Sequence, residues 1–143
     1  DERVKRLAGK IDRVLVDAPC SGLGTLRRNP DLKWRQSPQA VAELTAKQTA
    51  ILASAARLVK PGGRLVYATC SVLPDENEAI AEAFGATHPD FVPLQAGALL
   101  AQLKVAQAAS LCSGGSDGQT YLRLWPHLHQ TDGFFAAVWQ RKA

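Results

Sequence analysis

Two cysteines, Cys20 and Cys70, each stand just past an apolar run of the kind that forms a buried strand. The first belongs to Asp17–Gly22 and the second, half a chain later, to Ala68–Ser71. Because ligands bind at the carboxyl ends of the strands in open α/β sheets, both thiols are expected at one site. An ionised thiol is a strong carbon nucleophile. Together with Asp17, whose carboxylate could hydrogen-bond a polar ring, the pair indicates covalent chemistry.

These three side chains also have ordinary structural interpretations. A lone cysteine is frequently a small buried core residue, and Asp17 could instead cap a turn or pair with a loop arginine. The neighbouring residues favour the functional interpretation. Pro19 fixes the backbone just before Cys20. Gly22 and Gly24 let the loop pass close to a ligand without a Cβ in the way.

The elements that must position these residues are two parallel strands joined by a helix. Apolar residues with little alternation predict a strand covered on both faces at Ile11–Val16, and a second strand is predicted at Arg64–Thr69. Ser37 is a suitable N-cap with Pro38 at the first helical position, and apolar residues then recur at helical spacing up to a stop at Lys60–Gly63. A right-handed parallel crossover is the default for this arrangement.

The second half of the chain carries weaker patterns. A helix is expected over Pro74–Phe84, with acidic residues in its first turn, where the helix dipole favours them, and Gly85 at its end. These acidic residues are Asp75, Glu76 and Glu78. Further elements are expected as a short strand at 91–94, a helix within 95–112, and an antiparallel pair of strands at 120–125 and 134–140. Four aromatic residues of that pair are assigned to its core: Trp125, Phe134, Phe135 and Trp139.

Length and composition fit one globular unit. The chain has 143 residues, of which 46% are hydrophobic and 21% charged. No apolar run approaches the ~18 residues of a membrane span and no signal segment opens the sequence, so a soluble, cytoplasmic protein without a membrane partner is expected. Cys20, Cys70 and Cys112 form no C-x-x-C pair, and the three histidines lack metal-ligand spacing. Reduced thiols and no metal site are therefore expected.

A basic loop follows the first cysteine, within Ser21–Gln36. Its cations surround one tryptophan, a combination that can contact phosphates and stack on a base of single-stranded RNA. The residues concerned are Arg27, Arg28, Lys33, Trp34 and Arg35. The alternative is a solvated loop in which Trp34 merely plugs the core. The formal net charge of +4 permits a polyanionic partner without showing one.

Taken together, these motifs resemble the RNA cytosine-C5 methyltransferases. The resemblance begins with the two cysteine motifs and Pro74–Glu78. Three further segments look like the bacterial ribosomal RNA branch, the Sun/Fmu (RsmB) type: Arg27–Trp34, Gln48–Leu52 and Asp132–Ala136. Nearly the whole chain takes part, apart from Gln95–Thr120.

The resemblance implies a Rossmann-like α/β fold, S-adenosylmethionine as methyl donor and 16S ribosomal RNA as substrate. It implies that the thiol of Cys70 adds to C6 of cytosine, which makes C5 nucleophilic, and that Asp17 hydrogen-bonds the ring at N3. Cys20 matches the thiol that assists release after methyl transfer. Asp17 and Pro19 match positions that border the donor. DNA cytosine methyltransferases instead place the nucleophile in the Pro-Cys motif.

The chain departs from this family in lacking the upstream glycine-rich loop and acidic residue that hold the donor's methionine and ribose. Residues 1–143 are therefore expected to be the carboxyl-terminal part of a methyltransferase catalytic domain, with most of the donor site and any amino-terminal RNA-binding domain outside it. The edge at Ile11–Val16 would then be exposed and favour self-association. Two alternatives stay open: a non-catalytic RNA-binding or ribosome-assembly module with the same fold, and a transfer RNA cytosine-C5 methyltransferase.

Overall fold

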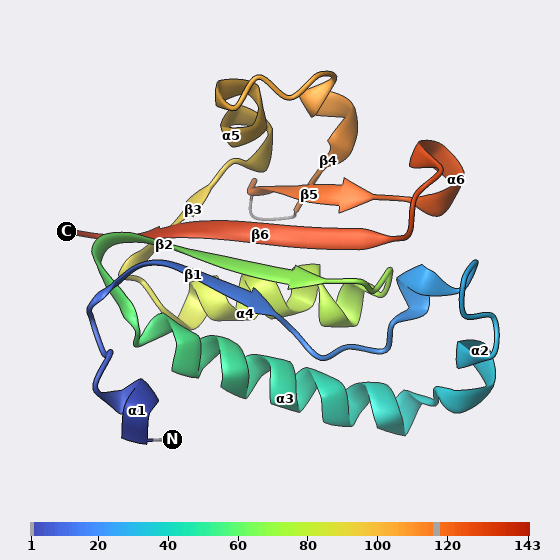
Figure 1. The fold of residues 1–143 in the computed structure, drawn as a ribbon, viewed down its shortest axis with the longest axis horizontal. Coiled ribbons are helices and arrows are strands. Elements are labelled where there is room, and N and C mark those ends of the chain that lie inside the picture. Colours follow the sequence, from blue (N-terminus) through green and yellow to red (C-terminus); the bar gives the residue numbers. More distant parts are fainter. Residues whose placement is uncertain (1, 116–117) are drawn as a thin grey trace.

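The computed structural model describes residues 2–115 and 118–143, and one six-stranded sheet forms its centre (Figure 1). Neighbouring strands follow the order β1-β2-β6-β5-β4, and β3 also pairs with β6. The strands are β1 (Ile11–Asp17), β2 (Val59–Thr69), β3 (Phe91–Leu94), β4 (Cys112–Gly114), β5 (Thr120–Leu124) and β6 (Phe134–Arg141). The α-helices are α1 (Glu2–Lys5), α2 (Leu32–Arg35), α3 (Pro38–Ala56), α4 (Glu78–Thr87), α5 (Ala96–Gln102) and α6 (Pro126–His129). Three 3-10 turns are η1 (Leu23–Thr25), η2 (Pro74–Glu76) and η3 (Ala108–Leu111).

The predicted parallel pair is confirmed. Strands β1 and β2 run parallel, with Val14 opposite Leu65 and Asp17 opposite Ala68, and α3 connects them. The start of α3 is also as predicted, because the Ser37 side chain accepts a hydrogen bond of 3.1 Å from the backbone of Ala40. Both cysteine motifs therefore leave the same edge of the sheet.

The predicted end of α3 is wrong by one turn. The helix ends at Ala56, and Val59–Gly63 belongs to β2 instead of a helix stop. Val59 is fully buried and pairs with Ile11. The next pair is Arg13 with Arg64, so β2 has more residues than β1 between the two pairs, and its Pro-Gly-Gly segment forms a bulge. Strand pairing thus overrides the local helical spacing near Val59.

Helix α4 also differs from its prediction. The segment starts with η2, breaks at Asn77, whose backbone is neither helical nor extended, and continues as α4 past Gly85 to Thr87. The break exists because the Asn77 side chain donates to Ser71 O at 3.0 Å and accepts from the Thr69 hydroxyl at 2.5 Å. These bonds hold the segment against the end of β2.

The carboxyl-terminal strands are confirmed, with one addition. Strand β6 pairs antiparallel with β5 as predicted, and its other edge pairs antiparallel with β2. The short strand β3 is confirmed as well and pairs with β6. The helix expected within 95–112 is only partly present. Helix α5 ends at Gln102, and the positive φ angles of Lys104 and Gln107 interrupt the helical backbone before η3.

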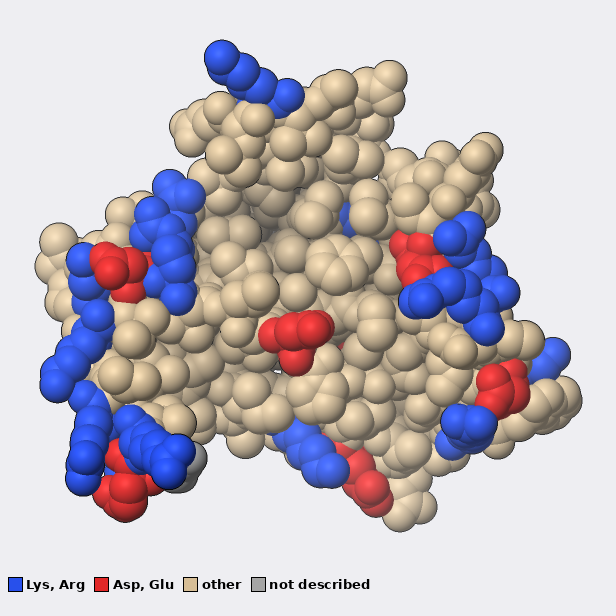
Figure 2. Space-filling model, in the orientation of Figure 1, with Lys and Arg blue, Asp and Glu red and all other residues tan. Residues whose placement is uncertain are grey.

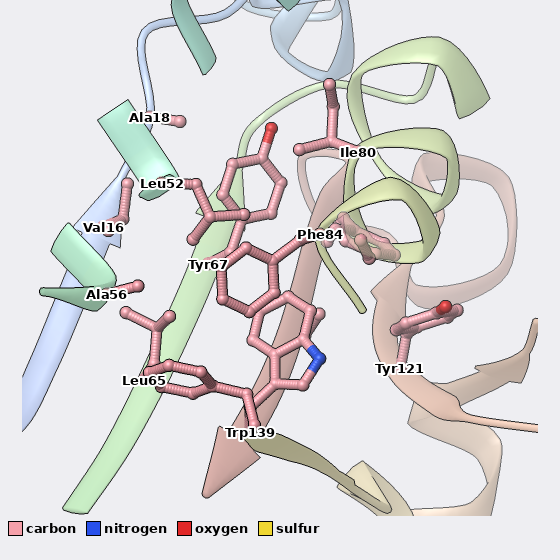
Figure 3. Packing of buried hydrophobic residues seen from close by; sticks show 14 of the residues in the cluster. Val16, Ala18, Leu52, Ala56, Leu65, Tyr67, Ile80, Phe84, Tyr121 and Trp139 are labelled. Atoms are coloured by element: carbon pink, nitrogen blue, oxygen red, sulfur yellow. The ribbon is translucent and has the colours of Figure 1, made fainter. Parts of the chain in front are cut away.

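The core lies between the sheet and helices α3 and α4, which pack side by side on one face (Figure 1). Figure 3 shows Tyr67 and Leu65 of β2, Trp139 of β6 and Phe84 of α4 converging there. Phe84 packs against Trp139 with ring centroids 4.8 Å apart. Of the four aromatic residues assigned to the terminal strand core, two, Phe135 and Trp139, are fully buried. The other two, Trp125 and Phe134, are half-buried.

Strand β1 forms one edge of the sheet, as expected. The expectation that it is covered on both faces is wrong, because Leu15 is 69% exposed and Val16 alone in this strand is buried. Helices α3 and α4 cover the same face, so the apolar run of β1 has one layer over it instead of two. Within the described ranges, none of the helices has both the length and the apolar character needed to span a membrane.

Candidate active site

The two predicted cysteines meet. Their Sγ atoms lie 3.4 Å apart, within hydrogen-bond distance for sulfur, and both side chains are half-buried. Cys20 comes from the loop after β1 and Cys70 from the loop after β2, so parallel pairing of these strands brings together residues 50 positions apart. The interpretation of each cysteine as an isolated core residue does not describe this arrangement.

Asp17 and Pro19 come just before Cys20 in the chain, at the end of β1. Asp17 ends β1 opposite Ala68 and is exposed, and its carboxylate makes no hydrogen bond or ion pair within residues 2–115 and 118–143. Pro19 is exposed too, while its carbonyl accepts a hydrogen bond of 2.9 Å from Gln48. The structural interpretation of Asp17 as a cap or an arginine partner is therefore wrong for this structure. Its carboxylate is available to a ligand.

Two glycines lock the cysteine loops to the loop before β6. Gly24 N donates to Cys70 O at 2.9 Å, and Gly133 N donates to Gly24 O at 2.7 Å. A Cβ on Gly24 would lie 2.5 Å from Cys70 O and 2.6 Å from Gly133 O, both backbone atoms. Gly24 was expected to let the loop approach a ligand, but its absent side chain serves contact between three backbone segments.

A buried carboxylate that the sequence did not single out lies under the two cysteine loops. Glu76 is fully buried and accepts hydrogen bonds from the serine that follows each cysteine, Ser21 and Ser71. Glu76 stands in the first turn of a helical segment, as predicted, but its side chain is buried in η2. The signal that was available is the serine after each cysteine, together with an acidic residue six positions after Cys70.

The surroundings of Cys20 favour its protonated form. Burial, reinforced by the hydrogen bond with Cys70, raises the pKa of the Cys20 thiol to about 12. Near neutral pH, Cys20 therefore keeps its proton and can donate it in the hydrogen bond to the Cys70 sulfur.

The basic loop is folded against Asp132. Arg27 and Arg28 both form ion pairs with this carboxylate, at 3.1 and 2.6 Å, and hold the pKa of Asp132 below its ordinary value. Arg35 pairs with Asp31. Figure 2 shows basic side chains gathered around acidic ones at the end of the molecule that carries α2 and α6. Part of the predicted RNA-binding charge is thus already compensated.

Trp34 is the one aromatic residue of this loop, and its side chain is exposed. It is 79% exposed, and the ammonium group of Lys33 lies 4.9 Å from its ring centroid. The interpretation of Trp34 as a core plug is wrong for this structure. An exposed ring beside cations remains suited to stacking on an unpaired base.

A cavity of about 600 Å³ opens beside the cysteine loops. Leu23 and Leu73 line it on that side, and the start of α3 lines the other, but Asp17 and the two cysteines do not reach it. We therefore do not place the reacting base there. No cluster of three or more histidine, cysteine or acidic side chains among the described residues is arranged to hold a metal ion.

Comparisons with known proteins place this geometry in a family. The family model described as 16S rRNA methyltransferase RsmB/F matches residues 1–140, including the segment that carried no motif resemblance. A probable ribosomal RNA small subunit methyltransferase B of Synechocystis is 46% identical over 127 residues, which are 89% of this chain and 26% of that protein. A probable methyltransferase B of Bacillus subtilis is 41% identical over 133 residues, 93% of this chain and 28% of that protein. The chain thus spans little more than a quarter of either relative.

Solved structures agree. The crystal structure of PH0851 superposes with a TM-score of 0.79 at 40% identity, covering 94% of this chain and 27% of that one. The structure of NSun6 from Pyrococcus horikoshii with SFG gives a TM-score of 0.74 at 26% identity, covering 99% of this chain and 33% of that one. These matches confirm the expected methyltransferase α/β fold. The chain belongs to the RsmB/F family of 16S rRNA methyltransferases.

Proposed function

We propose that the protein containing this chain methylates cytosine at C5 in small-subunit ribosomal RNA, with Cys70 as nucleophile and Cys20 as the thiol that assists release. One observation carries the proposal: the two sulfur atoms lie 3.4 Å apart at the carboxyl edge of two parallel strands. A reaction in which one thiol adds to a base and a second thiol assists its release needs two sulfur atoms at this range.

The chemistry balances with these two groups. The Cys70 sulfur forms a bond to C6 of the ring, and the electron pair of the C5–C6 double bond makes C5 nucleophilic. C5 would then take the methyl group of a sulfonium donor, and the sulfur of that donor would keep the electron pair of the broken sulfur–methyl bond. Loss of the C5 proton to a base restores the double bond as the sulfur–C6 bond breaks, and Cys70 leaves. We assign Cys20 to this last step, in which its S–H group can donate a hydrogen bond to the departing Cys70 thiolate while a separate base takes the C5 proton.

The protonation of Cys20 supports the division of roles. Because burial raises the pKa of Cys20 to about 12, this thiol keeps its proton near neutral pH, and its S–H group can donate a hydrogen bond to the Cys70 sulfur. A sulfur that accepts a hydrogen bond is stabilised as the thiolate, which is the attacking form. This arrangement favours Cys70 as the nucleophile over Cys20.

The donor we propose is S-adenosylmethionine, which supplies an electrophilic methyl group. The residues present fit the edge of such a site, because Asp17 is exposed and unpartnered and Pro19 is exposed beside it. Asp17 would orient the cytosine ring or the donor from the end of β1. We propose that the rest of the donor site lies in parts of the protein outside residues 1–143, of which this chain would be the carboxyl-terminal catalytic portion.

Ribosomal RNA is the proposed substrate because relatives that match most of this chain are named for it. We propose that the basic loop meets the RNA, with Trp34 stacking on a base and its cations near phosphates. An enzyme acting on ribosomal RNA would work in the cytoplasm, where the cysteines remain reduced.

The test is to identify the methylated nucleoside. Full-length protein would be incubated with radiolabelled S-adenosylmethionine and 16S ribosomal RNA or transfer RNA, and the RNA digested to nucleosides. The proposal predicts 5-methylcytidine from 16S RNA and normal activity in Cys112→Ala, because Cys112 lies on β4 away from the thiol pair. Methylation at the amino group of cytosine, or methylation of transfer RNA alone, would contradict it. RNA binding without any methyl transfer would favour the binding-module alternative.

A further inference from the structure

We propose that Glu76 is a positioning residue that fixes the two cysteine loops relative to each other, so that the Cys20 and Cys70 sulfur atoms meet. This inference deepens the proposed function, and its effect on turnover rests on that function. The geometry of the thiol pair can be measured independently of it.

The carboxylate of Glu76 joins both loops through the residues next to the thiols. Its Oε1 accepts from the backbone N–H of Ser21 at 2.8 Å, and its Oε2 accepts from the hydroxyl of Ser21 at 2.7 Å. Oε2 also accepts from the hydroxyl of Ser71. Ser21 follows Cys20 and Ser71 follows Cys70, so one oxygen atom ties the neighbours of both thiols together.

The two hydroxyls also accept hydrogen bonds from the backbone of their own loops. Ser21 Oγ accepts from the backbone of Leu23 at 3.4 Å, and Ser71 Oγ accepts from the backbone of Leu73 at 3.0 Å. Each hydroxyl oxygen thus accepts one backbone N–H and donates its single proton to Glu76 Oε2. The carboxylate form, which only accepts, matches this set of donors.

Other bonds fix Glu76 itself and extend its reach. Gln48 donates to Glu76 Oε1 at 3.2 Å and to the carbonyl of Pro19 at 2.9 Å, which links the carboxylate to the residue before Cys20. The hydroxyl of Tyr67 donates to the backbone carbonyl of Glu76 at 2.6 Å. Glu76 is thus held from β2 and from α3 while it holds the two loops.

Among the described residues, the carboxylate of Glu76 has no cationic partner. None of the ion pairs found across residues 2–115 and 118–143 includes Glu76, although its side chain is fully buried. Burying a charge is costly unless hydrogen bonds compensate it, and here four donors do so. Glutamine keeps the shape of the side chain but replaces one acceptor oxygen with an NH₂ donor. In one orientation the NH₂ group faces the N–H donors of Ser21 and Gln48, and in the other it faces the two serine hydroxyls.

The direct test measures how readily the thiols join. Full-length wild-type and Glu76→Gln proteins would be equilibrated with reduced and oxidised glutathione, and the peptides carrying Cys20 and Cys70 quantified by mass spectrometry. Two thiols and one oxidised glutathione give one protein disulfide and two reduced glutathione molecules. The sulfur atoms must move from 3.4 Å to about 2.05 Å apart to form the disulfide, so a small change in loop position changes the equilibrium constant. We expect the equilibrium constant to fall by roughly tenfold or more in Glu76→Gln.

Glu78→Gln is the matched control. Glu78 lies two residues away and is also largely enclosed, with 23% side-chain exposure, but its partner is the buried Arg123 and not a cysteine loop. Denaturant unfolding of both variants separates loss of stability from loss of alignment. The proposal predicts an unchanged disulfide equilibrium in Glu78→Gln even where stability falls. An equal fall in both variants would overturn it.

Turnover gives the second measurement. Glu76→Gln should lower kcat by roughly tenfold or more while KM for RNA stays within about twofold, because alignment of the thiols and not RNA binding is disturbed. Glu76→Asp, which keeps the charge, should recover part of kcat. If Glu76→Gln fails to fold, Ser71→Ala removes one hydroxyl from the same network and should lower the disulfide equilibrium constant, and an unchanged value there overturns the proposal. Absence of 5-methylcytidine in wild type would overturn the proposed function while leaving the disulfide result to decide the role of Glu76.

Discussion

Gly24→Ala is expected to separate the cysteine loops by adding a single methyl group. The new Cβ would lie 2.5 Å from Cys70 O and 2.6 Å from Gly133 O, whereas ordinary contact begins at 3.4 Å. At least one backbone segment must therefore move by about 0.9 Å. Because the atoms in the way are backbone atoms, no side-chain rotation relieves the clash. The hydrogen bonds that Gly24 makes to Cys70 and Gly133 stretch as a result.

The cost follows from these contacts. Overpacking a tight site typically costs about 1–3 kcal/mol, and weakening two backbone hydrogen bonds adds about 1 kcal/mol. Replacing glycine lowers the entropy of the unfolded chain, which stabilises the folded state by about 0.4–1 kcal/mol. We therefore expect Gly24→Ala to lower the free energy of unfolding by about 1–3.5 kcal/mol and to reduce methyl transfer.

Gly85→Ala supplies the control. Gly85 lies inside α4, a Cβ added there would meet nothing within 4 Å, and its φ is not positive. The same chemical change should raise the free energy of unfolding there by about 0.5–1 kcal/mol, since alanine is the better helix former. Denaturant unfolding of full-length variants would compare the two. A Gly24→Ala protein as stable and as active as wild type would refute the proposed contact between the three loops.

Further predictions concern the RNA surface and the thiols. Replacing Arg27 and Arg28 with alanine should weaken RNA binding. The slope of log binding constant against log salt concentration should fall by about 0.7 for each lost phosphate contact, with Lys47→Ala on α3 as a surface-charge control. An unchanged slope would mean that both arginines serve only to pair with Asp132. Trp34→Ala should cost about 1–3 kcal/mol of RNA binding at unchanged slope and stability, because the ring is exposed; loss of folding would restore the core-plug interpretation. Burial raises the pKa of Cys20 from 9.0 to about 12, so the folded chain holds the thiol proton more tightly than the unfolded chain does. The stability that comes from this difference is complete below pH 9. It is lost as the pH rises toward 12, because the unfolded chain releases the proton first. Urea midpoints of Cys20→Ala should therefore fall less steeply across this range than those of wild type, and parallel pH curves would contradict that account.

Much of the fold follows from local sequence patterns. The apolar run at Ile11–Val16 predicted β1, and Ser37 with Pro38 predicted the start of α3, because caps and strand composition act over a few residues. The meeting of Cys20 and Cys70 could also be inferred, since parallel strands joined by a helix place their carboxyl ends at one edge. These features need no knowledge of distant contacts.

The parts that could not be predicted depend on contacts between distant residues. Val59 continues a helical spacing locally but pairs with Ile11 in the sheet. Glu76 sits in an acidic run typical of a helix start, yet the serine hydroxyls of two separate loops decide its orientation. The contact between Gly24 and Gly133 joins residues more than a hundred positions apart, and no periodicity marks it.

The division of labour between the two thiols is the central claim, and trapping of a covalent protein–RNA complex tests it most directly. Full-length Cys20→Ala, given RNA and S-adenosylmethionine, should accumulate a denaturation-resistant complex, because Cys70 still attacks C6 but release is impaired. Cys70→Ala should form no complex and transfer no methyl group, and the double variant should lose the complex. If Cys70→Ala traps RNA while Cys20→Ala does not, the nucleophile is Cys20 and the assignment is contradicted.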